Sequence, residues 1–586
     1  MSGSESFNSQ ILYEVNDKPP HWLAASLGMQ TVALILAGIT LTPIIALQAV
    51  GLVEQYGNWV VFAALMVSGV CTILQARPIW GIGAGYVLFM GTSGAFLAVS
   101  IAALKTGGMP LLATLVAVSA IVQLTFARKM SIFRRIVTPT VGGTVVTLIA
   151  VTIMPIAFKK LSHLPADYPG HELAAVWTSV LSLAAMLAVS FFSSGKMRLW
   201  GPVVGVLVGW IVAHLFGLSD LSRVSDAAWL GLPEAAWPGL DLSFSAEFWW
   251  LLPGFVIVTI IGALETFGDG IAIQDVSQRE KKPTDYRVVQ GAVSADGLGN
   301  LLSGLMGTLP NTTYSTSISV VDMTGVAAKR VGVYGGLSLL LLAFCPKLSA
   351  FLQCIPQPVV GVYIVMLLVL LFAHGLRLVF SDGMNFDNGI VFGLAFWVGI
   401  GFQNRQIFNL EMSTGWHQLM DNGMTAGGIT AVVLSWIISL KAARVHKAKF
   451  PMHTDSLREI QQFVERRAMG AGWSGRDRMK LGLVTEEAFV LLAERASSEE
   501  GTSRDVTVRM QLKGALIDIE FVSAPLGTNV EGLLAELPEE SHEEADDFAL
   551  RLLQHMTEDI RHQEYSNAGF LAVTVKREGT DEVRGI

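Results

Sequence analysis

The stretch 308-TLPNTTYSTSISV-320 lies in a very hydrophobic part of the chain, yet it carries a proline, an asparagine and eight hydroxyl side chains. In hydrocarbon every backbone N–H and C=O must find a partner, so irregular backbone survives only where protein or a cavity covers it. Pro310 cannot donate a backbone hydrogen bond. The stretch therefore predicts a short extended piece followed by a half-helix, whose N-terminal N–H groups face a cavity.

The composition around this stretch is that of a membrane protein. The 586 residues are 52% hydrophobic and 15% charged, whereas soluble domains carry about 25% charged residues. Apolar runs of roughly 20 residues can each span a bilayer. We expect a mainly α-helical membrane protein with fourteen transmembrane segments, near residues 22–50, 57–76, 82–104, 110–127, 136–158, 173–194, 199–217, 248–273, 287–304, 311–325, 331–347, 354–374, 386–403 and 424–442.

Charge divides the chain into regions with different surroundings. Residues 451–586 hold 26 acidic and 15 basic residues, a net charge of −11, so the remainder is near +3. Basic residues gather in the loops that lie inside if the N-terminus is cytoplasmic, which is the positive-inside bias. An even number of spans then places both termini in the cytoplasm. We expect a polar N-terminus (1–20), a transmembrane domain (21–445) and a cytoplasmic α+β domain (446–586), whose segments alternate helical and strand patterns.

Several functional classes have no support in the sequence. The three cysteines are scattered in apolar runs, which argues against a disulfide framework or a metal cluster. No Walker-type phosphate loop occurs, which argues against transport driven by ATP hydrolysis. We therefore expect a protein that is not an enzyme and that uses no cofactor and no metal.

A second polar interruption occurs at 89-FMGTSGAFLA-98, which mixes Gly, Thr and Ser within an apolar run. It falls in the third predicted span, and 308–320 falls in the tenth. These positions correspond if the chain is a seven-plus-seven inverted repeat. Broken segments at matching places in inverted repeats indicate a transporter's substrate site. The alternative is that small residues only let helices pack closely.

Acidic residues occur within the predicted spans near these interruptions. Glu265 and Asp269, in 262-GALETFGDGIAIQ-274, are four residues apart and share a helix face. Charges inside a span are costly and usually functional. Two nearby carboxylates repel when both are ionised, which favours proton binding. Asp296 is a third such acid, which either binds substrate or braces the broken tenth span through backbone N–H groups. The alternative for Asp269 is a capping or pairing role near the helix end.

These stretches resemble the nucleobase–cation symporter-2 family, also called nucleobase–ascorbate transporters, which includes xanthine and uracil permeases. The resemblance covers roughly residues 20–445. Its most specific part is 307-GTLPNTTYSTSISVVDMTGVAAKR-330, with the proline, the Thr/Tyr/Ser run and the closing Thr324-Gly325-Val326 and Arg330. It is also carried by 30-QTVALILAG-38, 138-TPTVGGTVVTLIA-150, the Glu265–Asp269 segment and Asp296.

The resemblance implies a core domain moving against a gate domain, often in a dimer, with spans three and ten broken. Family substrate sites lie between the half-helices of these spans, beside a glutamate on span eight. The matching glutamate here is Glu265, and the polar residue one turn later is Asp269. Span three would supply Gly94 and Phe96, the latter as a stacking ring, and span ten would supply Ser315 and Thr316. Proton coupling would depend on Glu265, with Asp296 as a second coupling or bracing acid.

The chain departs from the family pattern at places that bear on the substrate. After the Tyr-Ser pair the family usually has Glu or Gln, then Asn, then a spacer and Gly, where this chain has Thr316, Ser317 and Ser319. A Glu or Gln can pair with the edge of a nucleobase, whereas threonine is shorter and offers one hydroxyl. The usual His after Gln30 is Thr31. A different purine, a modified base or a non-nucleobase anion therefore stays open as the substrate.

The tail faintly resembles the ATPase-like fold of anti-sigma-factor kinases, around 485-TEEAFVLLAER-495 and 521-FVSAPLGTNVEG-532. The position for a magnesium-holding Asn is Leu491, and that for an adenine-reading Asp is Ala524. Gly527 and Gly532 do not restore a phosphate loop. We expect a degenerate, non-catalytic domain used for regulation or dimer contact, and an unrelated α+β domain is the alternative.

The leading hypothesis is a secondary transporter: a proton-coupled symporter of a nucleobase or a similar planar polar heterocycle, working by alternating access. We expect small-molecule substrate, protons (or sodium) and the lipid bilayer as partners, a homodimer, no nucleic acid, and location in a bacterial inner membrane. One alternative is a membrane receptor that signals through its tail. Another is an anion transporter of the sulfate-carrier type, which Glu265 disfavours because it would repel an anion.

Overall fold

The computed structural model describes residues 11–130, 138–165, 168, 170–171, 173–218, 222–233, 236–280, 282–381, 383, 385–404, 406–407, 423–441, 445–497, 505–513, 515–524, 530, 545–565 and 568–577. The chain forms two compact units. The first, here the membrane unit, comprises Met1–Glu280 and Val288–Ile438, and the second, the C-terminal unit, comprises Lys281–Arg287 and Ser439–Ile586.

The first half of the membrane unit contains long helices and one short extended segment. Its elements are α1 (His21–Gln48), α2 (Val53–Ala76), β1 (Met90–Thr92), η1 (Gly94–Phe96), α3 (Leu97–Arg128), α5 (Pro139–Leu161), α6 (Ala174–Phe192), η2 (Gly195–Trp200), α7 (Gly201–Leu215) and α8 (Ser222–Asp226). The second half comprises α9 (Ala246–Asp275), α10 (Tyr286–Met306), β2 (Asn311–Thr313), α11 (Thr316–Thr324), α12 (Arg330–Ala343), α13 (Pro346–Gln353), α14 (Gln357–Ser381), α15 (Phe386–Gln403) and α17 (Gly423–Lys441).

The apolar length of these helices identifies a mainly helical, multi-pass membrane protein. Within the described residues, eight helices are long and apolar enough to cross a membrane, or nine if the bent pair α12 and α13 counts as one span. The number is lower than the fourteen predicted spans partly because α3 runs through two of them. It kinks there at Gly107 and Gly108, and the φ of +69° at Gly108 favours glycine. α11, with nine residues, is too short to be counted.

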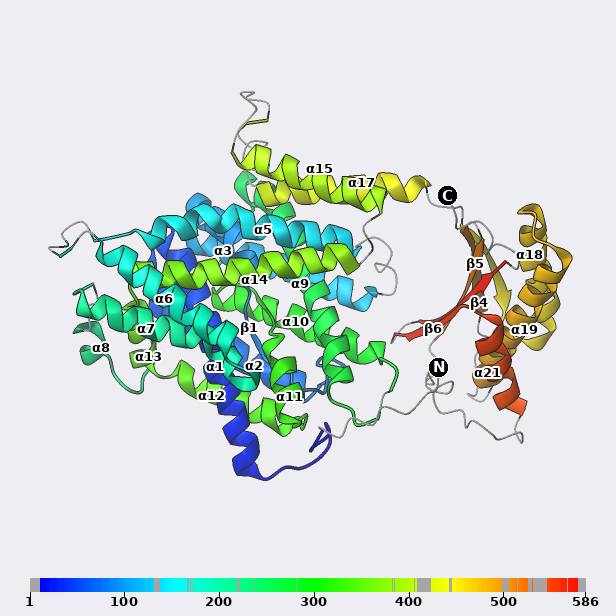
Figure 1. Ribbon diagram of the computed structural model, residues 1–586, viewed down its shortest axis with the longest axis horizontal. Helices are drawn as coiled ribbons and strands as arrows, with labels where there is room; N and C mark the ends of the chain where they lie inside the picture. The colour runs from blue at the N-terminus through cyan, green and yellow to red at the C-terminus, as the bar shows by residue number, and fades with distance from the viewer. Residues whose placement is uncertain are drawn as a thin grey trace. The chain divides into compact units, whose positions relative to one another are not determined.

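The helices of the membrane unit pack as two bundles. In the first bundle, α12 lies against α1 and α2, and α9 lies against α3 and α11. α10 joins it at Gly304, where an added Cβ would come within 2.5 Å of the Ala117 backbone on α3. In the second bundle α14 packs along α5, as Figure 1 shows, and α6, α7 and α15 complete it. One core of buried apolar side chains draws on both bundles, and a second core lies within the first bundle, around α1, α2 and α12.

The N-terminal segment before α1 is fastened to the first bundle. The N–H groups of Leu12 and Tyr13 donate to the Gly325 carbonyl at 2.8 and 3.0 Å, and the Ala327 N–H donates to the Tyr13 carbonyl at 2.8 Å. Gly325 ends α11 in the left-handed conformation, with a φ of 65°. This conformation explains the glycine in the Thr-Gly-Val motif, because other residues pay a steric penalty there.

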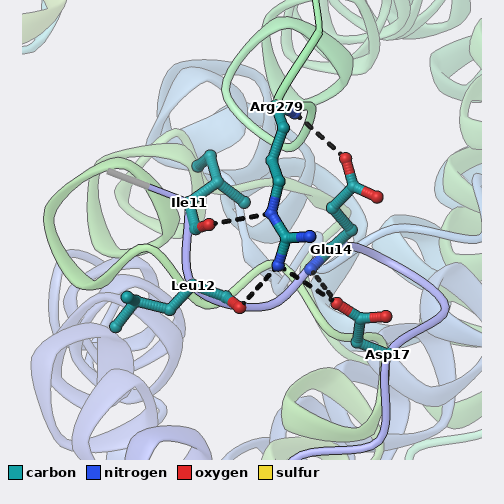
Figure 2. A network of polar contacts seen from close by, with 5 residues as sticks. All are labelled: Ile11, Leu12, Glu14, Asp17 and Arg279. Carbon is teal, nitrogen blue, oxygen red and sulfur yellow. Dashed lines mark hydrogen bonds and ion pairs between the residues drawn. The ribbon is translucent and has the colours of Figure 1, made fainter. Parts of the chain in front are cut away.

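Arg279, just beyond the end of α9, holds the same segment from the other side (Figure 2). Its guanidinium donates to the carbonyls of Ile11 and Leu12 at 3.1 and 2.8 Å and lies 3.6 Å from the Asp17 carboxylate. Its backbone N–H donates to the Glu14 carboxylate at 3.1 Å. The N-terminal segment therefore ties the end of α9 to the end of α11.

The C-terminal unit is an α+β structure with its own apolar core. Its antiparallel sheet has the strand order β3-β4-β5-β7-β6, formed by β3 (Val445–Pro451), β4 (Asp505–Lys513), β5 (Leu516–Ser523), β6 (Asp559–Glu564) and β7 (Gly569–Lys576). Its helices are η3 (Thr454–Ser456), α18 (Leu457–Gly470), α19 (Gly475–Ser497) and α21 (Ala545–Met556). The helical and strand patterns of the sequence predicted α18, α19, α21, β4, β5 and β7, but not the two edge strands β3 and β6. β3 carries Lys447 and Lys449, as edge strands often do.

The stretches that carry the kinase-like resemblance are only partly described. Leu491 on α19 is 3% exposed and belongs to the apolar core of the C-terminal unit. Ala524 directly follows β5. Residues 525–529 and 531–532, with Gly527 and Gly532, lie outside the described residues.

Candidate substrate site

Two extended segments meet in the middle of the first bundle, at the two polar stretches that interrupt the apolar sequence. β1 and β2 pair antiparallel, with Gly91 opposite Thr312. Each strand leads into a helix, β1 into η1 and α3 and β2 into α11, as the sequence predicts for both stretches. The first N–H groups of a helix have no acceptor within it and carry partial positive charge. Gly94 and Thr316 therefore begin two helix N-termini that offer hydrogen-bond donors beside the strand crossing.

Glu265 lies on α9, whose neighbouring side chains bond directly to β2. Its carboxylate makes no hydrogen bond and no ion pair within the part of the chain that the structure describes. The side chain is half-buried, and Gly268, three residues further on the same helix face, is exposed. A Cβ added at Gly268 would meet no atom within 4 Å. Glu265 is thus a half-buried acid without a partner in the described part of the chain, and open space lies at Gly268 on the same helix.

Asp269, one turn further along α9, is fully occupied by its neighbours. Its two carboxylate oxygens accept hydrogen bonds from the hydroxyls of Thr313 and Ser315, at 2.6 and 2.7 Å. The side chain is buried, with 6% of the residue exposed. Charge-assisted bonds of this length are among the stronger ones in proteins. Asp269 therefore fixes the end of β2 and the start of α11 against α9.

Asp296 on α10 sits at the centre of a buried network behind the strand crossing. One carboxylate oxygen accepts from the Gln123 amide at 2.7 Å and the Thr266 hydroxyl at 3.0 Å. Asn300, one turn later, donates to Gln123 at 2.7 Å and accepts from the Asn311 backbone N–H at 2.6 Å. Asp296 therefore supports β2 indirectly, through Gln123 and Asn300. The Asn311 backbone N–H donates to Asn300 and not to Asp296.

Part of this network was not foreseen from the sequence. Gln123 and Asn300 were not among the predicted site residues, although an amide within an apolar run is a signal of a polar contact in the membrane. Tyr314 was likewise missed: its hydroxyl donates to the Thr92 carbonyl at 2.8 Å and so joins the two broken segments. Its ring fits because Gly91 has no side chain, and an added Cβ there would approach the ring to 2.9 Å.

The sequence and the fold of this chain are similar to those of known membrane transporters. A family model described as a permease family (Xan_ur_permease) matches residues 24–407, which is more than half of the chain. The chain belongs to this permease family. The matched range includes both broken segments and all three acids.

Relatives with assigned names agree with the family match. This permease is 28% identical over 450 residues to the xanthine permease XanP of Escherichia coli, covering 74% of this chain and 96% of the relative. It is 26% identical to the xanthine permease of Bacillus subtilis, covering 72% and 95%. It is 27% identical to a putative purine permease of Clostridium perfringens, covering 73% and 93%.

Among solved structures, the murine anion transporter Slc26a9 in its inward-facing state shares the fold. The TM-score is 0.50 at 12% identity, over 75% of this chain and 72% of that chain. At this identity the likeness concerns the fold alone.

The tail beyond residue 407 lies outside the family match.

Three residues that depart from the family pattern, Thr316, Ser317 and Thr31, differ in their burial and in their hydrogen bonds. Ser317 is 1% exposed, and its hydroxyl accepts from the Phe89 N–H at 2.9 Å, so it braces α11 against the segment before β1. Thr316, the first residue of α11, is half-buried, and its side chain makes no hydrogen bond within the described part. Thr31 is buried in α1 and donates to the Leu27 carbonyl at 2.8 Å. Of these three, Thr316 has the side chain free to meet a ligand.

The residues expected from the third span lie next to α9 and to the second bundle. Phe96 is fully buried, and its ring lies 3.7 Å from a Cβ placed on Gly262, nearly one turn before Glu265. Gly94 faces Leu367 of α14, whose side chain comes within 2.9 Å of a Cβ added there. The candidate site therefore lies where the first bundle meets α14.

Proposed function

We propose that this permease is a proton-coupled symporter of a nucleobase, of the xanthine or another purine type or uracil-like, or of a related planar polar heterocycle. The proposal rests on Glu265, whose carboxylate has no hydrogen-bond or ion-pair partner among the described residues, and on its position in α9, a helix that contacts η1, β2 and α11. The names of the xanthine and purine permease relatives support this substrate class. A heterocycle with ring N–H donors and carbonyl acceptors matches a site that offers one acceptor and several N–H donors.

In the proposed bound state, Glu265 accepts a hydrogen bond from a ring N–H of the substrate. Ring carbonyl groups accept from the N–H groups at Gly94 and Thr316, where the helix dipoles favour negative charge. Phe96 and the Ser315 and Thr316 hydroxyls border the ring. Asp269 holds the start of α11 in place, and Asp296 supports β2 through Gln123 and Asn300.

Proton coupling follows from the cost of moving a charge through a membrane. Glu265 loses hydration through burial and interacts electrostatically with Asp269 and Asp296, so a negative charge at this place is unfavourable. A proton on Glu265 removes that charge and leaves a hydroxyl that can donate as well as accept. Loading of substrate and proton together would make translocation cheaper than with substrate alone.

The proposed function also implies a division of the membrane unit into two domains, a number of spans, an oligomeric state and an orientation in the membrane. The first bundle would be the core domain and the second the gate domain of a fourteen-span, seven-plus-seven inverted repeat. We propose a homodimer in the bacterial inner membrane, with both termini and the C-terminal unit in the cytoplasm and a regulatory role for that unit. The basic residues of the predicted inside loops support this orientation.

The decisive experiment is uptake by proteoliposomes that contain the full-length permease. Radiolabelled xanthine, hypoxanthine, guanine and uracil would be offered with and without an inward proton gradient, at constant sodium. We expect accumulation of at least one base that depends on the gradient and is lost in Glu265→Gln. Accumulation driven by a sodium gradient at equal pH would show that sodium, and not the proton, is the coupling ion. Absence of uptake for every base would overturn the substrate class.

A further inference from the structure

At the end of the membrane unit where α1 and α5 end and α14 begins, one lysine joins the two bundles. The Lys160 ammonium, at the end of α5, donates to the Gln48 side chain on α1 at 2.8 Å and to the Gln357 side chain on α14. α1 belongs to the first bundle, whereas α5 and α14 belong to the second. These three residues, here called the outer latch, therefore connect the bundles directly.

A cavity of about 360 Å³ lies beside the outer latch. Gln357 belongs both to the latch and to the cavity wall. The rest of the wall comes from both bundles and includes polar and apolar groups: Glu54, His163, Pro165, Leu218, Gln353, Cys354, Ile355, Pro356 and Pro358. Its volume lies at the small end of the range for ligand pockets, which suits a single-ring or two-ring heterocycle.

Buried apolar side chains fill the space between the outer latch and the candidate site. Ile45 of α1, Ile153 of α5 and Ile364 of α14 are each at most 1% exposed and belong to the same core as Phe96. Leu367, which faces Gly94, lies ten residues after Gln357 on α14. At 1.5 Å per residue, the latch lies about 15 Å from the level of the site. Open space, by contrast, lies at Gly268, three residues after Glu265 on α9.

From this geometry we infer that the outer latch is the external gate of the transport pathway, and that the cavity beside it is the vestibule where the heterocycle first binds. The inference rests on the proposed function and orientation. Lys160 closes the pathway by holding α1 to α5 and α14. Opening to the outside requires both of its bonds to break and the apolar layer to part, so that substrate passes from the vestibule to Glu265.

The test measures access from outside to a cysteine placed at Leu367, in full-length permease whose half-buried Cys345 and Cys354 are replaced by serine. A membrane-impermeant maleimide is added to intact cells. Lys160→Met keeps the length of the side chain and removes the ammonium. We expect external labelling to be roughly 100-fold faster or more in Lys160→Met, because two charge-assisted hydrogen bonds no longer favour the closed state. Gln48→Ala and Gln357→Ala should give smaller increases.

Matched variants control for other effects. Lys159→Met removes the neighbouring, exposed ammonium and should leave the labelling rate unchanged. Lys160→Arg should restore most of the protection. Labelling by a membrane-permeant maleimide and the size-exclusion profile in detergent report whether each variant is folded. Equal external labelling in folded Lys160→Met and native permease would overturn the gate.

The labelling test does not depend on knowing the substrate. If Lys160→Met opens the external path while no nucleobase is taken up, the gate stands and the proposed substrate class falls. If gradient-driven uptake is found but labelling does not respond to Lys160→Met, the proposed function stands and the gate falls. Protection of Cys354 in otherwise native permease by external xanthine, in the millimolar range, would support the vestibule, and lack of protection would remove it.

Discussion

Glu265 and Asp269 lie one turn apart on the same helix, yet their surroundings are opposite. Asp269 is buried and accepts two hydroxyl hydrogen bonds, whereas Glu265 is half-buried and has no hydrogen-bond partner within the described residues. The difference teaches that an acid inside the membrane has a role set by its donors. An acid whose oxygens are already occupied holds the structure, and an acid without donors is available to substrate and proton.

The sharpest test of this contrast is Glu265→Gln. A hydrogen bond to a charged group contributes about 1.5–3 kcal/mol, so we expect roughly 10- to 100-fold weaker substrate binding together with loss of gradient-driven uptake. The thermal unfolding midpoint should not fall, because no bond within the described part is lost. Binding and unfolding would be followed by isothermal titration and differential scanning fluorimetry. A strongly lowered midpoint would mean that Glu265 is structural after all.

Asp269→Ala should give the opposite profile. It leaves the hydroxyls of Thr313 and Ser315 without their acceptor, which costs about 1–3 kcal/mol of stability for each unsatisfied group. We expect a clearly lower unfolding midpoint, with reduced uptake as a consequence. Asp269→Asn retains one oxygen acceptor and serves as the milder control. The contrast would break if Asp269→Ala unfolded like the native permease while losing only substrate affinity.

Thr316→Gln extends the contrast to the other side of the candidate site. The Thr316 side chain makes no hydrogen bond to any residue that the structure describes, and a glutamine there offers the amide that the family pattern usually has. One gained or lost neutral hydrogen bond is about 1 kcal/mol, so the ratio of xanthine to uracil uptake should change by roughly 5- to 10-fold. Competition assays would measure it, with Ser319→Gln as the control. An unchanged ratio would place Thr316 outside the contact surface.

Arg279→Ala should have the smallest effect. The guanidinium side chain is 37% exposed, so its ion pair with Asp17 is screened by water, and its remaining bonds are to backbone carbonyls. We expect a loss of stability below about 1 kcal/mol and near-native uptake. Faster proteolysis of the N-terminal segment would report its release. A large loss of uptake would show that the contact of Arg279 at the end of α9 affects the position of Glu265.

The sequence was informative where local chemistry decides the structure. Pro310 and the hydroxyl run predict extended backbone followed by a helix, and β2 and α11 have that form. The acids Glu265 and Asp269 stand out by their position alone. A pairing role for Asp269 was only one of two alternatives, because both acids lie on one helix face and only the three-dimensional arrangement places Thr313 and Ser315 beside Asp269. The number of spans stays a prediction: at Gly107 and Gly108, between the third and fourth predicted spans, only two non-helical residues separate two helical stretches.

The pairing of β1 with β2 has a consequence for how the permease is made. Gly91 pairs with Thr312, 221 positions later in the chain. At about 5–20 residues per second, the ribosome needs roughly 10–45 s to deliver the second strand after the first. During that interval β1 lacks the partner that satisfies its peptide groups, and lipid supplies none. Until the second half arrives, the peptide groups of β1 must therefore stay out of the bilayer interior. Water or an insertion factor has to supply their hydrogen-bond partners in the meantime.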